Sequence, residues 1–305
     1  MIYSFLKLVR FPNLILIILT QVFIKYFLFE RFGIATTLTD FQFLLLCLST
    51  LCIAAAGNII NDIYDQEADL INKPNKIIIG KSISEKLGFN FYIALTILGV
   101  GIGFYLSNII ERPGFSAMFI IISALLYLYA TYLKNIIILG NILISCLVAM
   151  VILIIGLYDL MPAITPQNQP TQAVMFSIIL DYALFAFLIN WLREMVKDQQ
   201  DVNGDFNTGR NSIPIAIGKD RANKVIAAIA LIPFILIIYY MYEYLYDNIY
   251  AVLYTLLLLV GPLLYFITKI FSAKTIKEFS HLSFTLKLIM LFGLFSIAIY
   301  QFILL

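Results

Sequence analysis

The sequence predicts an all-α membrane protein, built as one bundle of about nine transmembrane helices. First, 62% of its 305 residues are hydrophobic and only 12% are charged. In soluble domains about half of the residues are hydrophobic and about a quarter are charged. Second, the mean hydropathy is +0.96, and a water-soluble fold of this composition would lack polar side chains to cover its surface. Third, the apolar residues form continuous runs of about 20, the length of a membrane-crossing helix, rather than the alternating segments of about 10 typical of barrel strands.

These runs define the elements in chain order. Hydropathy predicts spans at 13–30, 41–60, 87–107, 115–133, 136–157, 173–192, 222–242, 250–270 and 284–304. The first run follows basic residues, as in a signal peptide, but its small-residue cleavage site at 33–35 is weak, so we expect a retained span. The connection 157–171 contains three prolines and is predicted to be a loop. Because no polar stretch marks a boundary, we expect residues 1–305 to form a single domain.

Lys and Arg are distributed unevenly between the two sides of this topology. Three of them, Lys25, Arg31 and Arg112, fall on one side, and the other 17 of the 20 fall on the opposite side. Cytoplasmic loops are enriched in Lys and Arg, so the N-terminus is predicted to be cytoplasmic and the C-terminus to lie outside. We therefore expect a multi-pass protein of the plasma membrane whose active site faces the cytoplasm.

The remaining counts exclude several classes of site. The single histidine, His281, rules out a multi-histidine zinc site and a bis-histidine haem. The three cysteines, Cys47, Cys52 and Cys146, lie in apolar runs and behave as small apolar residues rather than as a disulfide framework. A net charge of +2 is too small to indicate nucleic-acid binding. Asp181 falls inside the sixth span, where an isolated charge is costly, so we expect it to have a structural partner.

Two acidic segments follow the second and sixth spans and share the spacing D-x-x-D-x-x-x-D. At 100° per residue, positions i, i+3 and i+7 lie within a wedge of about 60°, so each segment aligns its carboxylates along one helix edge. An even number of spans separates the two segments, which places them on the same side. Gly204 interrupts the second segment, so we expect Asp205 to lie in a loop. The first segment contains Asn58, Asn61, Asp62, Asp65 and Asp69, and the second contains Glu194, Asp198, Asp201 and Asp205.

Carboxylates at this spacing repel one another and need a cation. Carboxylate and amide oxygens suit Mg²⁺, Mn²⁺ or Ca²⁺, and Mg²⁺ commonly shares its ligands with substrate phosphates. A single segment of this kind would most simply be a solvated loop. Here the segment occurs twice, and the related sequences 77–81 and 215–219 follow the two copies, which indicates an internal duplication with halves of about 1–135 and 136–305. Nearby cations would face the same substrate phosphates as the metal ion, namely Lys73, Lys76, Lys81, Lys134, Lys197 and Arg210.

These residues resemble the UbiA superfamily of intramembrane prenyltransferases, which carries one aspartate motif after its second helix and another after its sixth. The resemblance covers nearly the whole chain and also implies nine spans. One departure is that Lys76 and Ile77 stand where the family often has Arg-Pro, and Lys76 keeps the charge but not the bidentate fork. The matching residues are Asn61, Asp62, Asp65 and Asp69; Asp198, Asp201 and Asp205; Arg10 and Asn13; and Tyr129, Lys134, Gly140 and Asn141.

The resemblance implies Mg²⁺-dependent transfer of an isoprenyl group from its diphosphate, with Mn²⁺ as an alternative metal. The metal ligands it implies are Asp62, Asp65, Asp69, Asp198, Asp201 and Asp205. The residues expected to carry catalysis are Asp62, Asp65, Asp198 and Lys134. Those expected to contact substrates are Arg10, Asn13, Asn58, Asn61, Lys76, Tyr129, Glu194, Lys197 and Arg210. The partners implied are an isoprenyl diphosphate, an acceptor and the lipid bilayer.

The second acidic segment and the Ser-Ile-Pro-Ile sequence at 212–215 look most like the branch that geranylgeranylates geranylgeranylglyceryl phosphate. On this resemblance Arg10, Asn13 and Asn58 lie near the acceptor, and an Asp or Glu194 accepts the proton of its hydroxyl. An aromatic quinone precursor, such as 4-hydroxybenzoate, dihydroxynaphthoate or homogentisate, is the alternative acceptor. A transporter of a phosphorylated substrate is the non-enzymatic alternative, although transporter ion sites usually lie near the membrane midplane. A Ca²⁺-regulated scaffold is disfavoured because neither segment has the EF-hand order of ligands.

Overall fold

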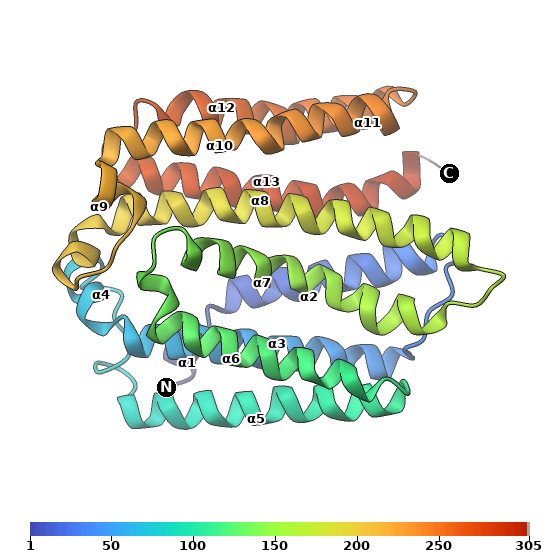
Figure 1. Cartoon of the computed structure of the whole chain (residues 1–305), viewed down its shortest axis with the longest axis horizontal. Helices are drawn as coiled ribbons and strands as arrows, with labels where there is room; N and C mark the ends of the chain where they lie inside the picture. Colours follow the sequence, from blue (N-terminus) through green and yellow to red (C-terminus); the bar gives the residue numbers. More distant parts are fainter. Residues whose placement is uncertain (304–305) are drawn as a thin grey trace.

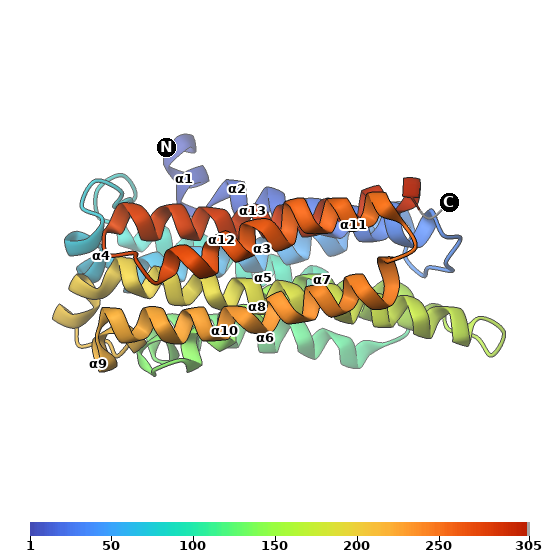
Figure 2. The same ribbon diagram turned by 90° about the horizontal axis from the view of Figure 1, so that it is seen from above.

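The computed structural model describes residues 1–303, with side chains described for residues 1–299. It is a bundle of long helices lying side by side (Figures 1 and 2). Four π-helical turns continue helices within their spans, namely η1 (Phe23–Glu30), η4 (Gly156–Leu160), η6 (Met241–Leu245) and η7 (Leu256–Val260). The α-helices are α1 (Ile2–Leu8), α2 (Phe11–Val22), α3 (Asp40–Tyr64), α4 (Gln66–Asn72), α5 (Glu85–Ile109), α6 (Ser116–Thr131), α7 (Leu139–Ile155), α8 (Gln169–Asn207), α9 (Ile213–Ile217), α10 (Lys219–Tyr240), α11 (Ile249–Thr255), α12 (Gly261–Ile270) and α13 (Ile276–Ile303).

The bundle has the expected number of membrane-crossing helices. Large apolar side chains face outward, and Ile97, Ile235 and Leu257 are 68%, 61% and 69% exposed, as a lipid-facing surface requires. The predicted all-α membrane fold is therefore confirmed. Within residues 1–303, nine segments are long and apolar enough to span, namely Phe11–Glu30, Asp40–Tyr64, Glu85–Ile109, Pro113–Thr131, Leu139–Ala163, Gln169–Asn207, Lys219–Leu245, Ile249–Ile270 and Ile276–Ile299.

Two helices extend well beyond the apolar runs that predicted them. Helix α8 is 39 residues long and continues from its apolar part through the second acidic segment. Helix α13 begins at Ile276 rather than near 284. There Thr275 Oγ1 accepts a hydrogen bond from the Glu278 backbone N–H, and Glu278 Oε2 accepts one from the Thr275 N–H. This reciprocal capping starts the helix in a charged turn that hydropathy alone does not detect.

One end of the bundle carries the polar connections. Figure 1 places α4, α9 and the loops around them together at this end, and the N-terminus lies toward it. Helix α4 packs against the last turns of α8 there. We call this the acidic end, because both acidic segments reach it, and the opposite end, where α13 finishes, the far end (Figure 1).

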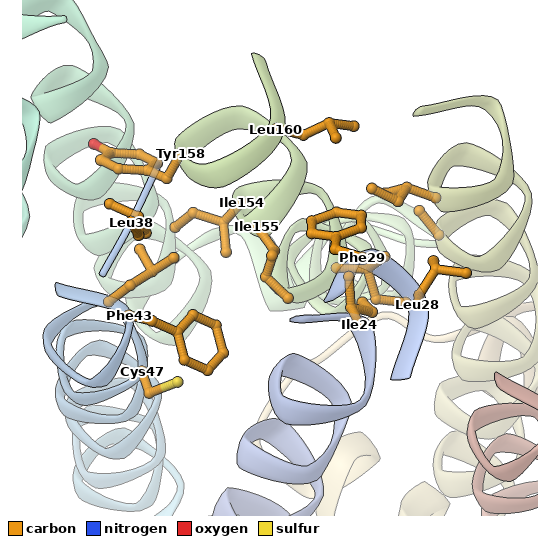
Figure 3. Packing of buried hydrophobic residues seen from close by; sticks show 14 of the residues in the cluster. Ile24, Leu28, Phe29, Leu38, Phe43, Cys47, Ile154, Ile155, Tyr158 and Leu160 are labelled. Carbon is orange, nitrogen blue, oxygen red and sulfur yellow. The ribbon is translucent and has the colours of Figure 1, made fainter. Parts of the chain in front are cut away.

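Packed side chains fill the bundle toward the far end. Figure 3 shows Ile24 and Phe29 of η1 lying against Ile154 and Ile155 of α7, with Phe43 of α3 beside them. These five residues are at most 3% exposed. They form a tight apolar core between the helices at this end of the molecule.

An ion pair between Lys25 and Asp159 is buried within the same region. Lys25 Nζ donates to Asp159 Oδ2 at 2.9 Å, and the two side chains are 2% and 0% exposed. The other oxygen of Asp159 accepts the backbone N–H groups of Thr37 and Leu38. The ion pair ties the 33–39 loop to η1 and η4.

The expectation of a structural partner for Asp181 is wrong. Asp181 is exposed on the outward face of α8 and makes no hydrogen bond or ion pair within the described part of the chain. The sequence places it between apolar residues of the span, but the rotation of α8 turns it away from its neighbours.

Candidate functional site

The two acidic segments meet at the acidic end, and Asn72 joins them directly. Its Nδ2 donates to the Asp201 backbone oxygen at 2.9 Å, and its Oδ1 accepts the Gly204 N–H at 2.8 Å. Beside it, Lys73 Nζ donates to Asp201 Oδ2 at 2.7 Å. The end of α4 is therefore held against α8 by Asn72 and by Lys73, the residue that follows the helix.

Gly204 makes this close approach possible. A Cβ atom built on it would lie 2.6 Å from the Ala68 carbonyl oxygen and 2.4 Å from Asn72 Nδ2. Contrary to expectation, Gly204 does not break the helix, because α8 continues to Asn207 and includes Asp205. The glycine serves helix packing, and the carboxylate that follows it is held at a helical position.

The first acidic segment, by contrast, is not a single helix edge. Helix α3 ends at Tyr64, and Asp65, with φ −98° and ψ 2°, separates it from α4. Asp62 therefore lies on α3 and Asp69 on α4. The break turns α4 toward α8, so that the segment bends around the site instead of running straight past it.

Asp65 receives three donors from separate parts of the chain. Lys134 Nζ lies 2.6 Å from its Oδ1, and Asn61 Nδ2 lies 2.6 Å from its Oδ2. The Arg210 guanidinium also bonds Oδ1, and it reaches Asp205 Oδ1 at 3.3 Å. Arg210 therefore links a carboxylate of the first segment to one of the second.

The remaining aspartates have partners of their own. Arg10 donates to Asp62 Oδ1 at 2.8 Å, and Asn141 Nδ2 donates to Asp198 Oδ2 at 2.7 Å. Arg10 adopts a left-handed backbone conformation, with φ 55°, between α1 and α2. Non-glycine residues seldom occupy this region, and such strain concentrates at functional positions.

The donor set fits a hard divalent cation. Every candidate ligand at the meeting point is a carboxylate or amide oxygen, and Asn61 Oδ1 is buried without a hydrogen-bond partner beside Asp65. Among the described residues, no three acidic or imidazole side chains form a closed cluster. The carboxylates are instead neutralised by Lys73, Lys134 and Arg210. These three side chains can also donate hydrogen bonds to phosphate oxygens.

Burial shifts the pKa of several groups that lie outside the spans. It lowers the pKa of the Lys134 ammonium to about 8, although the carboxylates of Asp205, Asp69 and Asp62 act in the opposite direction. It also raises the pKa of the Asp69 carboxyl, with Lys73 opposing. Lys134 is thus a cation whose charge responds to pH near the physiological range.

A cavity of about 330 Å³ opens beside this meeting point. Its mouth is polar, and its interior is lined by apolar side chains of α2, α3, α6, α7, α8 and α13. Its lining runs from Arg10, which precedes α2, along that helix to Ile24 in η1, about 20 Å at 1.5 Å per residue. Ile24 and Ile154 belong both to this lining and to the buried core of Figure 3, so packed side chains lie between the cavity and the far end.

The expected substrate residues fall into three groups. Arg10, Asn13, Asn58, Asn61, Tyr129, Glu194 and Lys197 line the cavity. Lys134 and Arg210 lie at the acidic segments, and both line a smaller hollow beside Asp198 and Asp205. Lys76 is exposed on its loop, and its ammonium makes no hydrogen bond or ion pair with the described residues. The structure brings Lys73, not Lys76, to the second acidic segment.

Sequence reasoning did not assign roles to four residues at the site. Asn72 and Asn141 bond the second acidic segment, and Arg193 and Lys287 line the mouth of the cavity. Asn141 matched the family pattern without an assigned role. Arg193 lies four residues before Lys197, hence on the same face of α8, and that spacing is a usable signal. Nothing in the local sequence marks Lys287 as a site residue.

Comparison with known proteins agrees with this geometry. Residues 31–289 match the profile of the UbiA prenyltransferase family. A relative from Korarchaeum cryptofilum, named digeranylgeranylglyceryl phosphate synthase, is 33% identical over 206 residues, which cover 67% of this chain and 66% of that protein, just under two thirds. A solved structure described as a digeranylgeranylglyceryl phosphate synthase in membranes is similar with a TM-score of 0.65 and 24% identity over 98% of both chains. A UbiA homologue from Archaeoglobus fulgidus bound to GPP and Mg²⁺ has a TM-score of 0.59 and 17% identity, covering 97% of this chain and 99% of its own.

Proposed function

Because this chain belongs to the UbiA prenyltransferase family, we propose that it transfers an isoprenyl group from its diphosphate to a lipid acceptor. The observation that carries the proposal is the juxtaposition of two acidic segments with an apolar cavity about 20 Å long. The acidic segments suit a diphosphate and its metal ions. The cavity suits a hydrocarbon chain, since burying each methylene contributes about 0.8 kcal/mol.

The metal in this proposal is Mg²⁺, with Mn²⁺ as the alternative. Asp62, Asp65 and Asp69 on one side and Asp198, Asp201 and Asp205 on the other would hold it, together with Asn61 Oδ1. When bound, Mg²⁺ neutralises the charge that develops on the departing diphosphate. The UbiA homologue bound to GPP and Mg²⁺ supports this assignment.

Residues of this chain then assist the departure of diphosphate. The bond between prenyl C1 and the diphosphate oxygen breaks, and its electron pair leaves with the oxygen. Lys134 and Arg210, which contact Asp65, donate hydrogen bonds to phosphate oxygens as their charge grows. The apolar walls, which include Leu126 and Val148, exclude water from the allylic cation.

The acceptor hydroxyl supplies the electron pair for the new bond to C1. Its proton passes to a carboxylate, and Glu194 is the one carboxylate of the described residues that lines the cavity. Lys197 Nζ holds Glu194 Oε1 at 2.5 Å and thereby orients it. Arg10, Asn13 and Asn58 lie at the same mouth, where an acceptor entering from the bilayer would contact them.

The acceptor class follows from the relatives and from the cavity. The Korarchaeum protein is named for a lipid product, and its sequence aligns with two thirds of this chain. A geranylgeranyl donor and a geranylgeranylglyceryl phosphate acceptor are therefore the substrates proposed here. Translocation of a substrate is disfavoured, because the buried core and the Lys25–Asp159 ion pair occupy the far end.

Orientation and duplication complete the proposal. The excess of Lys and Arg supports a cytoplasmic acidic end in the plasma membrane. An internal duplication is supported by Gly80 and Gly218, which occupy matching positions in the two related segments and both have positive φ, at 82° and 84°. The two halves would then form one catalytic domain.

The test uses purified full-length protein with Mg²⁺ and geranylgeranyl diphosphate. We expect a prenylated lipid from geranylgeranylglyceryl phosphate, identified by mass spectrometry, and no product from 4-hydroxybenzoate or dihydroxynaphthoate. Asp62→Ala and Asp198→Ala should each reduce kcat at least a hundredfold, and EDTA should abolish turnover until Mg²⁺ is restored. Wild-type turnover by both alanine variants, or prenylation of only the aromatic acceptors, would refute the proposal.

A further inference from the structure

The cavity mouth carries more positive charge than its own carboxylate can neutralise. Five charged residues line the cavity, four cations and one anion, namely Arg10, Arg193, Lys197, Lys287 and Glu194. Arg10 is paired with Asp62. The other three cations, which we call the basic cluster (Arg193, Lys197 and Lys287), have only Glu194 as an acidic neighbour within the cavity.

The members of the basic cluster are incompletely satisfied. Lys197 contacts Glu194 closely, but the nearest nitrogen of Arg193 lies 3.8 Å from the same carboxylate oxygen. Arg193 Nε is buried without a hydrogen-bond partner. Lys287 Nζ donates to a neutral acceptor, Asn13 Oδ1, at 3.1 Å. Charged groups at the edge of an apolar cavity are costly when unpaired, so this arrangement calls for a bound anion.

Arg193 and Lys287 of the basic cluster are set apart from the region proposed for the diphosphate. Arg193 precedes Asp198, the nearest aspartate of the second acidic segment, by five residues, about 7.5 Å along α8, and Lys197 is the member of the cluster next to that segment. Lys287 comes from α13, which packs on α8, whereas Asp62 and Asp69 come from α3 and α4. The diphosphate region has its own cations, which contact the acidic segments directly. Two anionic groups can therefore occupy the two regions at once.

We infer that the basic cluster binds the phosphate monoester of a lipid acceptor. This inference rests on the proposed function and deepens it. Three cations and one carboxylate leave an excess of two positive charges, and a phosphate monoester carries a charge of about −1.5 to −2 at neutral pH. Arg193 offers a guanidinium fork suited to phosphate, and the two lysines supply point charges.

The geometry also orients such an acceptor. In a glyceryl phosphate the free hydroxyl lies on the carbon next to the one that bears the phosphate. A phosphate held by Arg193 and Lys287 thus keeps the hydroxyl at the cavity mouth, where Glu194 also lies. The alkyl chain of the acceptor then extends along the apolar wall. Acceptors without a phosphate would leave the cations unpaired, which makes the basic cluster a determinant of specificity.

A binding measurement tests this inference without depending on turnover. The probes are a single-chain alkylglyceryl phosphate and the same alkylglycerol without phosphate, titrated into full-length protein in neutral-lipid nanodiscs. We expect the phosphate probe to bind at least tenfold more tightly. Arg193→Gln and Lys287→Met should each weaken it about tenfold or more, because each removes a charge-assisted contact. Lys287→Arg should retain most of the affinity.

Matched controls remove the same charge outside the cavity. Arg221→Gln and Lys277→Met replace exposed residues of α10 and α13, and both should leave the Kd of the phosphate probe within twofold. In transfer assays, the cavity variants should raise the KM of the phosphate acceptor, while the KM of geranylgeranyl diphosphate stays within threefold.

Unchanged probe affinity in the cavity variants, or a loss confined to geranylgeranyl diphosphate, would overturn the inference. A protein that binds the phosphate probe through these residues but transfers no prenyl group would instead refute the proposed function alone.

Discussion

Replacing Gly204 by alanine should separate the two acidic segments with little net change in stability. The new Cβ would lie 2.6 Å from the Ala68 carbonyl oxygen, whereas ordinary contact begins at 3.4 Å. Since that oxygen belongs to the backbone, α4 must retreat from α8 by the difference, about 0.8 Å. The same movement lengthens the hydrogen bonds of Asn72 to Asp201 and Gly204, which now measure 2.9 and 2.8 Å.

The size of the effect differs between stability and catalysis. Alanine is favoured over glycine within a helix by about 1 kcal/mol, while overpacking typically costs about 1–3 kcal/mol. These contributions oppose each other, so the unfolding free energy should change by at most about 2 kcal/mol. A displacement of about 1 Å at a catalytic site, by contrast, can reduce the rate about a hundredfold. We therefore expect kcat/KM for geranylgeranyl diphosphate to fall about a hundredfold.

The assay compares Gly204→Ala with Gly101→Ala. Gly101 also lies inside a helix, α5, but a Cβ there would meet no atom within 4 Å. Its variant should keep wild-type kinetics and unfold at the same or a slightly higher temperature. Both variants would be measured for Mg²⁺-dependent transfer and for thermal unfolding in the same detergent. If Gly204→Ala matched Gly101→Ala in kcat/KM, the role assigned to the α4–α8 contact would be refuted.

Two further outcomes follow from the charged groups. Because burial lowers the pKa of Lys134 to about 8, its side chain is a charged ammonium below that pH, and log(kcat/KM) should decline as pH rises through 8. The variant Lys134→Arg should move this decline above pH 9. A decline at the same pH in both proteins would exclude Lys134 as its source. Lys25→Met leaves Asp159 buried without its cation and should lower the unfolding free energy by about 3 kcal/mol. The control Arg31→Met removes an exposed charge and should change it by less than about 0.5 kcal/mol; equal unfolding temperatures for the two variants would contradict this account.

The spans and the acidic segments were predictable because their signals are local. Hydropathy over about 20 residues locates a membrane helix, and the spacing of Asp198, Asp201 and Asp205 places three carboxylates on one helix edge. Local signals also misled at two places. Gly204 predicts a helix break, but α8 is unbroken and α4 packs against this glycine. The spacing predicts that Asp65 lies on a continuous helix edge, but it is the residue between α3 and α4.

The sequence by itself determined the class of protein, the order of its helices and the family to which it belongs, since each depends on residues close together in the chain. Only the tertiary structure decided which groups meet. It brings Lys73 rather than Lys76 to the second acidic segment, and it joins Arg193 of α8 with Lys287 of α13 at one cavity. Such pairings depend on how far each helix is rotated and shifted against its neighbours, and no short stretch of sequence encodes that rotation.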